Sequence, residues 1–297
     1  MFKDELKQYV ADSGLVNQKP AGDGIYILKY KKKVFYKNLW NRYIAECRGT
    51  IVNEDFDIIS YPFTKIYNFG IEKQAPKLDD SVMVNAYRKI NGFMVSVTWY
   101  DGDILVSTTG STVSDYVQYA KEKINRDKFR LVCEQNPDYT FMLECVHEND
   151  PHIIQEKTGM YLLGYRKKEW GSRVEADRLD YYGEQFGCYV PEFFRVSVGE
   201  LKKMTKECHH EGFVAYTDTG TAFKIKSPFY LTSKWVSRNP RTEKLVNLNC
   251  DIKQSIDEEY HDLVDAIRLN ISEYTEMSEQ ERLSWVRKQL DITQNEI

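Results

Sequence analysis

A lysine ahead of a small turn is the first feature of this sequence that could carry out covalent chemistry. Lys89 lies in the segment RKINGF, residues 88–93, directly before a predicted strand. A lysine attacks only as the neutral amine, and partial burial or nearby cations favour that form by lowering its pKa. Gly92 would let the backbone approach a ligand closely. On its own the pattern more often marks an exposed turn, so it needs support from other residues.

Two acids and two lysines further along the chain give that support. Glu144 lies in an apolar predicted strand, and Glu211 opens another. Lys224 and Lys226 are separated by one residue, so both ammonium groups should project from the same face of a strand. Two carboxylates can hold a hydrated divalent metal, and aligned lysines can offset triphosphate charge. The structural alternatives are a strand-edge acid, a turn or helix cap, and an exposed strand face.

The composition is that of a globular protein. Of 297 residues, 42% are hydrophobic and 29% are charged. The sequence contains no apolar run near the length of a membrane span, and its charged start lacks the apolar region of a signal peptide. Its six cysteines form no C-x-x-C pair, which favours free thiols in a reducing compartment. We therefore expect a cytoplasmic protein without a membrane segment.

The net charge of −4 conceals an uneven distribution along the chain. Residues 251–297 hold 12 acidic and 5 basic residues, whereas residues 1–250 hold 33 acidic and 36 basic residues. The stretch 28–43 has six basic residues and no acid, with aromatic residues between them: Lys29, Lys31, Lys32, Lys33, Lys37 and Arg42 beside Tyr30, Phe35, Tyr36, Trp40 and Tyr43. Such a mixture suits a nucleotide or polynucleotide surface. The alternative is a solvated, twisted edge strand with an aromatic inner face.

Hydrophobic alternation predicts an α+β fold. Residues 93–99 and 104–108 flank Asp101-Gly102, which favours a tight hairpin turn. Further strands are predicted at 140–146, 160–165, 212–216 and 221–226, and helices at 114–125, 177–186, 197–207 and beyond Ser255. A change from strand-like to helical sequence near the segment SRNP, residues 237–240, predicts a boundary. We expect antiparallel sheets in residues 1–237 and a small, all-helical C-terminal domain in 238–297.

The order of these motifs resembles that of the covalent nucleotidyltransferase superfamily, and within it the bacteriophage RNA ligase 1 family. Lys89-x-Asn-Gly looks like motif I, Glu144 like motif III, Glu211-Gly like motif IV and Lys224-x-Lys226 like motif V. The segments ECRGT at 46–50 and PFTKIYN at 62–68 look like two elements of the phage ligases that capping enzymes and DNA ligases do not share in this form. The resemblance covers about residues 24–232.

The resemblance implies an adenylyltransferase domain whose antiparallel sheets surround ATP. The implied roles are AMP attachment for Lys89; contacts to ATP for Tyr30, Arg48, Lys65, Asn91, Gly92, Glu144, Lys224 and Lys226; Mg²⁺ or Mn²⁺ binding for Glu144, Glu211 and Asp257; and RNA contact for Tyr230. The residues alone leave Tyr230 open as a core tyrosine and Asp257 as a helix cap.

The sequence departs from the family pattern at three points. Asn91 stands where the phage type has aspartate, which removes a negative charge beside Lys89. Thr109 stands where a lysine is expected, so a phosphate contact is lost or supplied elsewhere. The region after residue 237 is shorter than the helical domain linked to tRNA repair in the family's best-known member.

The function implied by the resemblance is ATP-dependent RNA ligation through a lysyl-AMP and an adenylylated RNA. Its partners would be RNA with 5′-phosphate and 3′-hydroxyl ends, with a tRNA as one candidate, and a separate polynucleotide kinase-phosphatase. We expect a monomer, acting in the host cytoplasm if the chain is viral. The alternatives are a DNA ligase, a capping-type nucleotidyltransferase, and a non-catalytic nucleic-acid-binding module.

Overall fold

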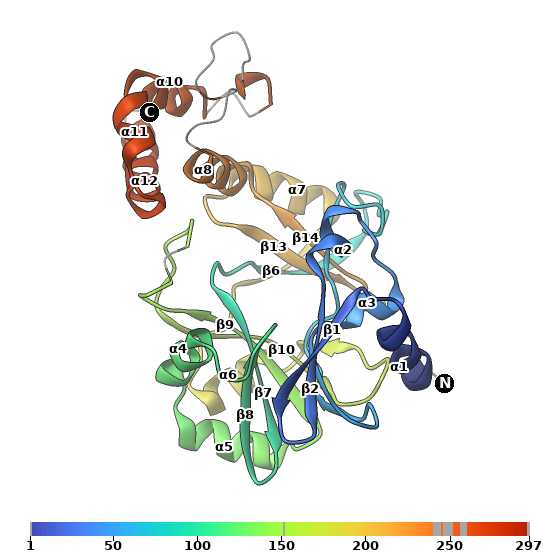
Figure 1. Ribbon diagram of the computed structural model, residues 1–297. Coiled ribbons are helices and arrows are strands. Elements are labelled where there is room, and N and C mark those ends of the chain that lie inside the picture. The colour runs from blue at the N-terminus through green and yellow to red at the C-terminus, as the bar shows by residue number, and fades with distance from the viewer. Residues whose placement is uncertain (1, 151, 240–244, 246–251, 256–259, 296–297) are drawn as a thin grey trace.

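The computed structural model describes residues 2–150, 152–239, 245, 252–255 and 260–295. Within these residues, three β-sheets form the body of the protein, and helices from the C-terminal part pack beside it (Figure 1). The predicted α+β class is confirmed. Among the helices that are described, none is long and apolar enough to cross a membrane.

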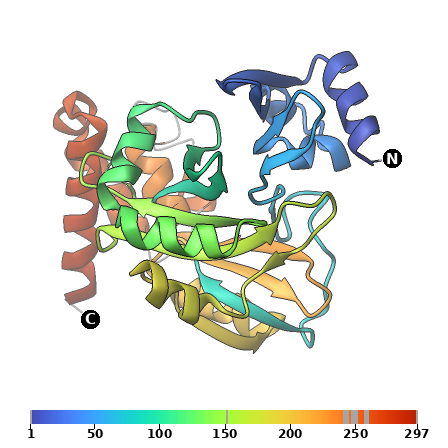
Figure 2. The ribbon, with the colours of Figure 1, turned by 90° about the horizontal axis from the view of Figure 1, so that it is seen from below.

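The N-terminal sheet joins four antiparallel strands in the order β1, β2, β3, β4, as far as the structure describes it. These are β1 (Val16–Gly22), β2 (Ile25–Tyr30), β3 (Arg48–Asn53) and β4 (Ile58–Ser60). Helix α1 (Phe2–Asp12) packs its Leu6 and Val10 against this sheet. Figure 2 shows the sheet in blue beside the other two, with α1 on its outer side.

The edge-strand interpretation of residues 28–43 was wrong. Strand β2 ends at Tyr30, and two short helices follow, α2 (Lys32–Tyr36) and α3 (Arg42–Glu46). The Asn41 side chain accepts hydrogen bonds from two backbone amides of the first turn of α3, which favours a helix there. The buried residues of this stretch are Val34, Trp40 and Ile44. In a strand, Tyr36, Asn38 and Arg42 would share their face, but all three are exposed.

The β9 sheet has the order β11, β10, β9, β7, β8 among the described residues, and all its pairings are antiparallel. Its strands are β7 (Phe93–Tyr100), β8 (Asp103–Thr108), β9 (Tyr139–Val146), β10 (Gly159–Lys167) and β11 (Val174–Glu175). The predicted hairpin is confirmed, because Asp101 and Gly102 have φ angles of 49° and 75°. Helices α4 (Asp115–Lys123), α5 (Arg126–Gln135) and α6 (Leu179–Phe186) contribute to the core on this sheet.

The β13 sheet brings together strands from distant parts of the chain. Its order in the described chain is β12, β6, β13, β14, β5: β12 (Phe193–Ser197), β6 (Met83–Arg88), β13 (Gly212–Thr217), β14 (Ala222–Lys226) and β5 (Tyr67–Asn68). The β14 and β5 pairing is parallel, and the others are antiparallel. Helix α7 (Val198–Glu207) begins with a capping box at Ser197 and Glu200 and buries Leu201 against the sheet.

Helices form the C-terminal part of the described chain. They are α8 (Pro228–Arg238), the 3₁₀ turn η1 (Ile252–Ser255), α10 (His261–Leu269), α11 (Ile271–Glu276) and α12 (Glu279–Asn295). Val236 of α8 packs in one apolar cluster with residues of α10 and α12, including Leu263 and Val286. Figure 1 shows this group beside the body. Ser278 and Glu281 form a capping pair before α12, since they exchange backbone-to-side-chain hydrogen bonds.

Candidate active site

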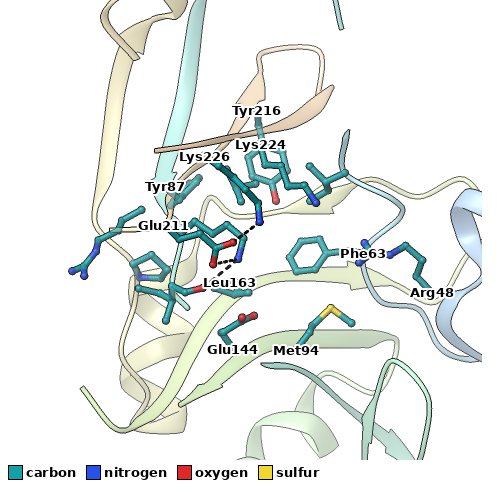
Figure 3. A pocket seen from close by; sticks show the side chains of 16 residues that line it. Arg48, Phe63, Tyr87, Met94, Glu144, Leu163, Glu211, Tyr216, Lys224 and Lys226 are labelled. Atoms are coloured by element: carbon teal, nitrogen blue, oxygen red, sulfur yellow. Dashed lines mark hydrogen bonds and ion pairs between the residues drawn. The ribbon is translucent and has the colours of Figure 1, made fainter. Parts of the chain in front are cut away.

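A pocket of about 290 Å³ lies between the β9 sheet and the β13 sheet. The β13 sheet contributes Tyr87, Arg88, Val214, Tyr216, Lys224 and Lys226 to its lining, and the β9 sheet contributes Met94, Glu144 and Leu163. Lys89, Glu211, Arg48 and Phe63 also line it. Figure 3 shows Lys224 and Lys226 reaching in from one side and Glu144 and Met94 from the other. We call this space the Lys89 pocket.

Lys89 lies directly after β6 of the β13 sheet, in the short segment that leads to β7 of the β9 sheet. Its backbone amide donates to the Gly212 carbonyl at 2.8 Å, which fixes the start of the side chain. Its Nζ donates to Glu211 Oε2 at 2.9 Å and to the Ile90 carbonyl at 3.3 Å. Burial acts to lower the pKa of Lys89, but Glu211 and Glu144 together raise it above its ordinary value. Lys89 is therefore held as an ammonium, contrary to the lowered pKa that the sequence suggested.

The Glu211 carboxylate binds three other polar side chains of the site. Besides Lys89, it binds the Lys226 Nζ at 2.9 Å and accepts from Asn91 Nδ2 at 2.7 Å. Burial would raise the pKa of Glu211, but the two ammonium groups hold it at about 2. The next residue, Gly212, has φ of +119°, and a Cβ there would lie 2.1 Å from the Ile225 carbonyl oxygen. Only glycine allows this close approach, which brings Glu211 beside β14.

Glu144 faces the pocket from β9, opposite Met94 of β7. Its Oε1 accepts one hydrogen bond, 3.2 Å from the Gly92 amide. Burial raises the pKa of Glu144 to about 7, and the charge of Lys89 offsets only part of that effect. A Cβ at Gly92 would lie 2.3 Å from the Cys145 carbonyl oxygen, so the K-x-N-G turn needs its glycine here.

The chemistry of these acids fits a divalent cation. The positive charge near the buried Glu144 carboxyl does not keep its pKa at the ordinary value, so an added cation would stabilise the ionised form. Glu211, which lines the same pocket, is ionised. Mg²⁺ and Mn²⁺ prefer carboxylate oxygens as protein ligands. The third predicted metal residue, Asp257, lies outside the described residues.

Lys224 and Lys226 both line the pocket, as their spacing on one strand predicted. Burial, together with the neighbouring charges of Lys65, Arg48 and Lys226, lowers the pKa of Lys224 to about 7. Such a cluster of cations is costly in an empty pocket and becomes favourable when an anion enters. The pocket is therefore prepared for a polyanion such as a triphosphate.

Arg48 and Lys65 come from the N-terminal region. Arg48, at the start of β3, lines the Lys89 pocket. Lys65 lines a neighbouring hollow of about 280 Å³, pairs with Glu72 at 2.9 Å, and lies 5.0 Å from the centroid of the Trp40 ring. The two hollows share three lining residues, Phe63, Ile66 and Tyr216. The predicted ATP contacts of Arg48 and Lys65 thus lie in adjoining spaces.

Two predicted tyrosines lie in packed surroundings. Tyr30 meets the edge of the Trp40 ring at a centroid distance of 4.7 Å and is not among the described residues that line the Lys89 pocket. Tyr230 is buried with Ile153 and Leu283, and the Lys226 Nζ lies 4.7 Å from the centroid of its ring. Tyr30 therefore lies apart from the group around Lys89, whereas Tyr230 adjoins it.

A lysine from β2 reaches the segment where the sequence lacks one. A Cβ built on Gly110 would lie 2.6 Å from the Lys29 Nζ, so this ammonium sits beside the Thr109-Gly110 backbone. Burial lowers the pKa of Lys29, and the charges of Lys19 and Arg48 lower it as well. Lys29 thus places a cation near the position that Thr109 occupies.

Helix α12 contacts the loop around Ile153, and the next residue, Ile154, is a hydrogen-bond partner of Asn91. Asn91 Oδ1 accepts from the Ile154 amide at 3.0 Å. Arg287 of α12 donates to the Ile153 carbonyl at 3.0 Å from Nε and 2.7 Å from Nη2, and also to the His152 carbonyl. An unbroken set of contacts therefore runs from α12 through this loop to Asn91, Glu211 and Lys89.

Sequence reasoning missed the apolar and aromatic lining of the pocket, which consists of Tyr87, Met94, Leu163, Val214 and Tyr216. The register explains why they are there: Lys224 lies opposite Val214, which lies opposite Tyr87 on the next strand. The period of two that placed both lysines on one face also places Val214 and Tyr216 on one face. The pairing of strands far apart in the chain was not readable from the sequence.

Comparison with known proteins identifies the family. The sequence profile of the RNA ligase family, of the phage RNA ligase 1 type, matches residues 46–234, which contain every motif described above. The chain belongs to the RNA ligase family. The resemblance drawn from its motifs is confirmed.

This member of the RNA ligase family is also similar to more distant proteins. One, from Autographa californica nuclear polyhedrosis virus, is named as a bifunctional polynucleotide kinase/RNA ligase and is 25% identical over 277 residues. The match spans 83% of this chain but only 37% of that relative. A structure of an archaeal ATP-dependent RNA ligase has a TM-score of 0.57 and 14% identity, covering 98% of this chain and 75% of the other.

A structure from Aquifex aeolicus, named as an ATP-dependent DNA ligase, has a TM-score of 0.52 and 15% identity and covers 95% of this chain and 76% of its own. At these identities the two structural matches show a shared fold and nothing finer.

Proposed function

We propose that this chain is an ATP-dependent RNA ligase that joins a 5′-phosphate end to a 3′-hydroxyl end through a Lys89-AMP and an adenylylated RNA. The observation that carries the proposal is the placement of Lys89. It lies in a pocket with cations suited to a triphosphate and two carboxylates suited to a metal, in a chain of the RNA ligase family.

In the first step, the Lys89 nitrogen forms a bond to the α-phosphorus of ATP, and the bond from that phosphorus to the bridging oxygen breaks. Pyrophosphate leaves, and the two protons that Lys89 loses from its ammonium form pass to solvent or a base. Nζ must lose one proton before the attack, because the ammonium that Glu211 holds has no lone pair to offer the phosphorus. Arg48, Lys224 and Lys226 offset the charge of the triphosphate and hold it in line.

In the second step, an oxygen of the RNA 5′-phosphate forms a bond to the AMP phosphorus, and the bond from that phosphorus to the Lys89 nitrogen breaks. Lys89 regains two protons from solvent or an acid and returns to its ammonium form. In the third step, an RNA 3′-hydroxyl attacks the activated 5′-phosphorus, AMP leaves, and the hydroxyl proton passes to solvent or a base. Glu144 and Glu211 would hold the metal, with Asp257 as a further proposed ligand. A bound Mg²⁺ or Mn²⁺ supplies positive charge beside the reacting phosphate.

The test is covalent labelling. The purified protein is incubated with ATP labelled at the α-phosphate and Mg²⁺ or Mn²⁺, and then separated under denaturing conditions. Wild type should retain label and Lys89→Ala should not, while Lys121→Ala, a change at an exposed lysine of α4, should label like wild type. If wild type takes no label after pyrophosphate has stripped any bound AMP, the site is that of a nucleic-acid-binding module.

The choice of polynucleotide needs a separate test, because the fold is shared with a protein named as a DNA ligase. We expect single-stranded RNA with a 5′-phosphate to be sealed faster than nicked DNA, and ATP to label the protein in preference to GTP. Faster sealing of nicked DNA, or a preference for GTP, would move the assignment to the corresponding alternative.

We further propose that a separate polynucleotide kinase-phosphatase prepares the RNA ends, with a cleaved tRNA as candidate substrate. The viral relative, whose name couples a kinase to a ligase, supports this pairing. RNA with a 5′-hydroxyl should then be joined only after a kinase has been added, and joining without one would contradict the proposal. We propose a monomer that acts in the cytoplasm.

We propose that residues 238–297 form a helical domain that supports the adenylyltransferase domain, residues 1–237. The Arg287 contacts to the 152–153 carbonyls support this role. Arg287→Ala should loosen the 152–154 loop that binds Asn91 and thereby slow self-adenylylation a few-fold. Lys288→Ala, at an exposed position of the same helix, should label at the wild-type rate. Equal rates in both variants would remove the support.

A further inference from the structure

Helix α2 exposes two aromatic rings side by side. Phe35 is 61% exposed and Tyr36 is 78% exposed, and their ring centroids lie 5.6 Å apart in an edge arrangement. The helix buries Val34 instead, in a cluster with Trp40 and Ile44. The two rings therefore contribute little to the core, and large exposed aromatic side chains are a common mark of a binding surface.

Three lysines lie on α2 or directly after it, within four residues of these rings. Lys32, Lys33 and Lys37 are exposed, and none forms an ion pair with a residue that the structure describes. The nearby Arg42, by contrast, is paired with Glu5 at 2.7 Å. We call Lys32, Lys33, Phe35, Tyr36 and Lys37 the α2 surface.

The α2 surface adjoins the hollows that lead to Lys89. Asn38, directly after it, accepts a hydrogen bond of 3.3 Å from the Gln74 side chain. Gln74 lines the hollow of Lys65, and that hollow shares Phe63, Ile66 and Tyr216 with the Lys89 pocket. A chain lying on the α2 surface can therefore continue toward the reactive lysine.

We propose that the α2 surface binds a single-stranded segment of the RNA substrate, with bases stacked on Phe35 and Tyr36 and phosphates beside Lys32, Lys33 and Lys37. Flat rings between cations match the alternating bases and phosphates of a single strand, whose bases are free to stack. A protein partner would have to match the positive charge with acids and gains no advantage from the approach to Lys89. The inference rests on the proposed function, since it names where that function's substrate lies.

The test measures binding of a fluorescent single-stranded RNA of about 12 nucleotides, within the usual length for such grooves, by anisotropy at low and moderate salt. Phe35→Ala/Tyr36→Ala should weaken binding roughly tenfold or more. Lys32→Ala/Lys33→Ala/Lys37→Ala should weaken binding and flatten its salt dependence. Tyr181→Ala on α6, where the ring is 49% exposed, is the matched control and should bind like wild type.

A conservative variant separates stacking from general apolar contact. Phe35→Leu/Tyr36→Leu keeps apolar side chains without flat rings, so it should also bind the single strand weakly while unfolding at the wild-type temperature. Unchanged RNA affinity in the alanine and leucine variants would overturn the inference, and so would an equal loss in Tyr181→Ala.

Self-adenylylation distinguishes this inference from the proposed function. All α2 variants should label with ATP at the wild-type rate, because that step uses no RNA. Wild type that fails to label but binds RNA through α2 would sink the ligase proposal and leave the surface standing. If wild type labels and the α2 variants bind RNA normally, the ligase proposal stands and the α2 inference fails.

Discussion

The Lys89 pocket and the α2 surface are both rich in lysine, but these lysines differ in burial and in ion pairing. In the pocket, Lys89 and Lys226 share the carboxylate of Glu211, and the pKa of Lys224 falls to about 7 because it is buried among other cations. On α2, Lys32 and Lys33 are exposed to solvent and form no ion pair with a described residue. The difference separates charges that are constrained by the fold from charges that are free to follow a ligand.

This difference teaches how one residue type serves two purposes. A buried lysine changes its proton affinity with every neighbour, so it can take part in chemistry. An exposed lysine keeps its ordinary charge and attracts phosphates with little effect on folding. The following changes should therefore disturb the pocket strongly and the α2 surface weakly.

The largest effect is expected for Glu211→Gln. Removing this carboxylate deprives Lys89 and Lys226 of the acid to which both are paired, which should cost about 3 kcal/mol of unfolding free energy. Self-adenylylation should fall about a hundredfold, equivalent to about 2.7 kcal/mol in the barrier. Urea unfolding and labelling rates measure both. Glu207→Gln, at an exposed position of α7, is the control, and equal behaviour of the two variants would contradict the central role of Glu211.

A slightly smaller effect is expected for Gly92→Ala. The new Cβ would lie 2.3 Å from the Cys145 carbonyl oxygen, so β7 and β9 must separate near Glu144. We expect a loss of about 2–3 kcal/mol in unfolding free energy and slower self-adenylylation. Gly199→Ala should cost less, because its Cβ would lie 3.2 Å from Asp80 Cβ and 3.3 Å from the Asp80 carbonyl oxygen, contacts that a small shift relieves. A neutral Gly92→Ala would mean that the turn can shift without disturbing the pocket.

Lys224→Met should stabilise the protein in a pH-dependent way. The folded-state pKa is about 7 and the ordinary value is 10.5, so the unfolded chain binds more protons between these values. The cost of burying the charge is full below pH 7 and disappears as pH rises toward 10.5. The variant should gain about 2 kcal/mol over wild type at pH 6.5, allowing for partial solvent contact, and less at pH 10. Urea unfolding at both pH values, with Lys121→Met as control, checks this; a constant gain would exclude the titration of Lys224 as its cause.

The smallest effect is expected on α2. Lys32→Ala and Lys33→Ala should each change the unfolding free energy by less than about 0.5 kcal/mol, because their charges are solvated. Thermal unfolding at low and high salt measures this. A loss above about 1 kcal/mol would show that these lysines stabilise the fold and would weaken the contrast with the pocket.

Local patterns predicted much of the fold. The hairpin at Asp101-Gly102 followed from turn chemistry, and the 197–207 helix followed from its periodicity. The stretch 28–43 was harder, because its aromatic residues favour strands by propensity while Asn41 favours the start of a helix. Tertiary packing decided between them.

The motifs predicted Lys89, Glu144, Glu211, Lys224 and Lys226 as one site, and the structure brings these five together. The sequence could not show that Glu211 pairs with Lys89 and raises its pKa, because those residues meet only through strand pairing across the chain. The roles carried over by resemblance remain predictions, including that of Tyr30, which packs beside Trp40. Asp257 falls outside the described residues.

The parallel pairing of β5 with β14 sets the order in which the site can be completed during synthesis. Tyr67 and Asn68 pair with Phe223 and Lys224, and the Phe69 amide donates to the Lys224 carbonyl. Strands that pair over such long separations form late in folding. A chain still emerging from the ribosome carries Lys89 long before it carries Glu211 and Lys226, so its reactive lysine stays unassembled. Under the proposed mechanism, a chain would load a nucleotide only after translation has passed residue 226, so unfinished chains would not react.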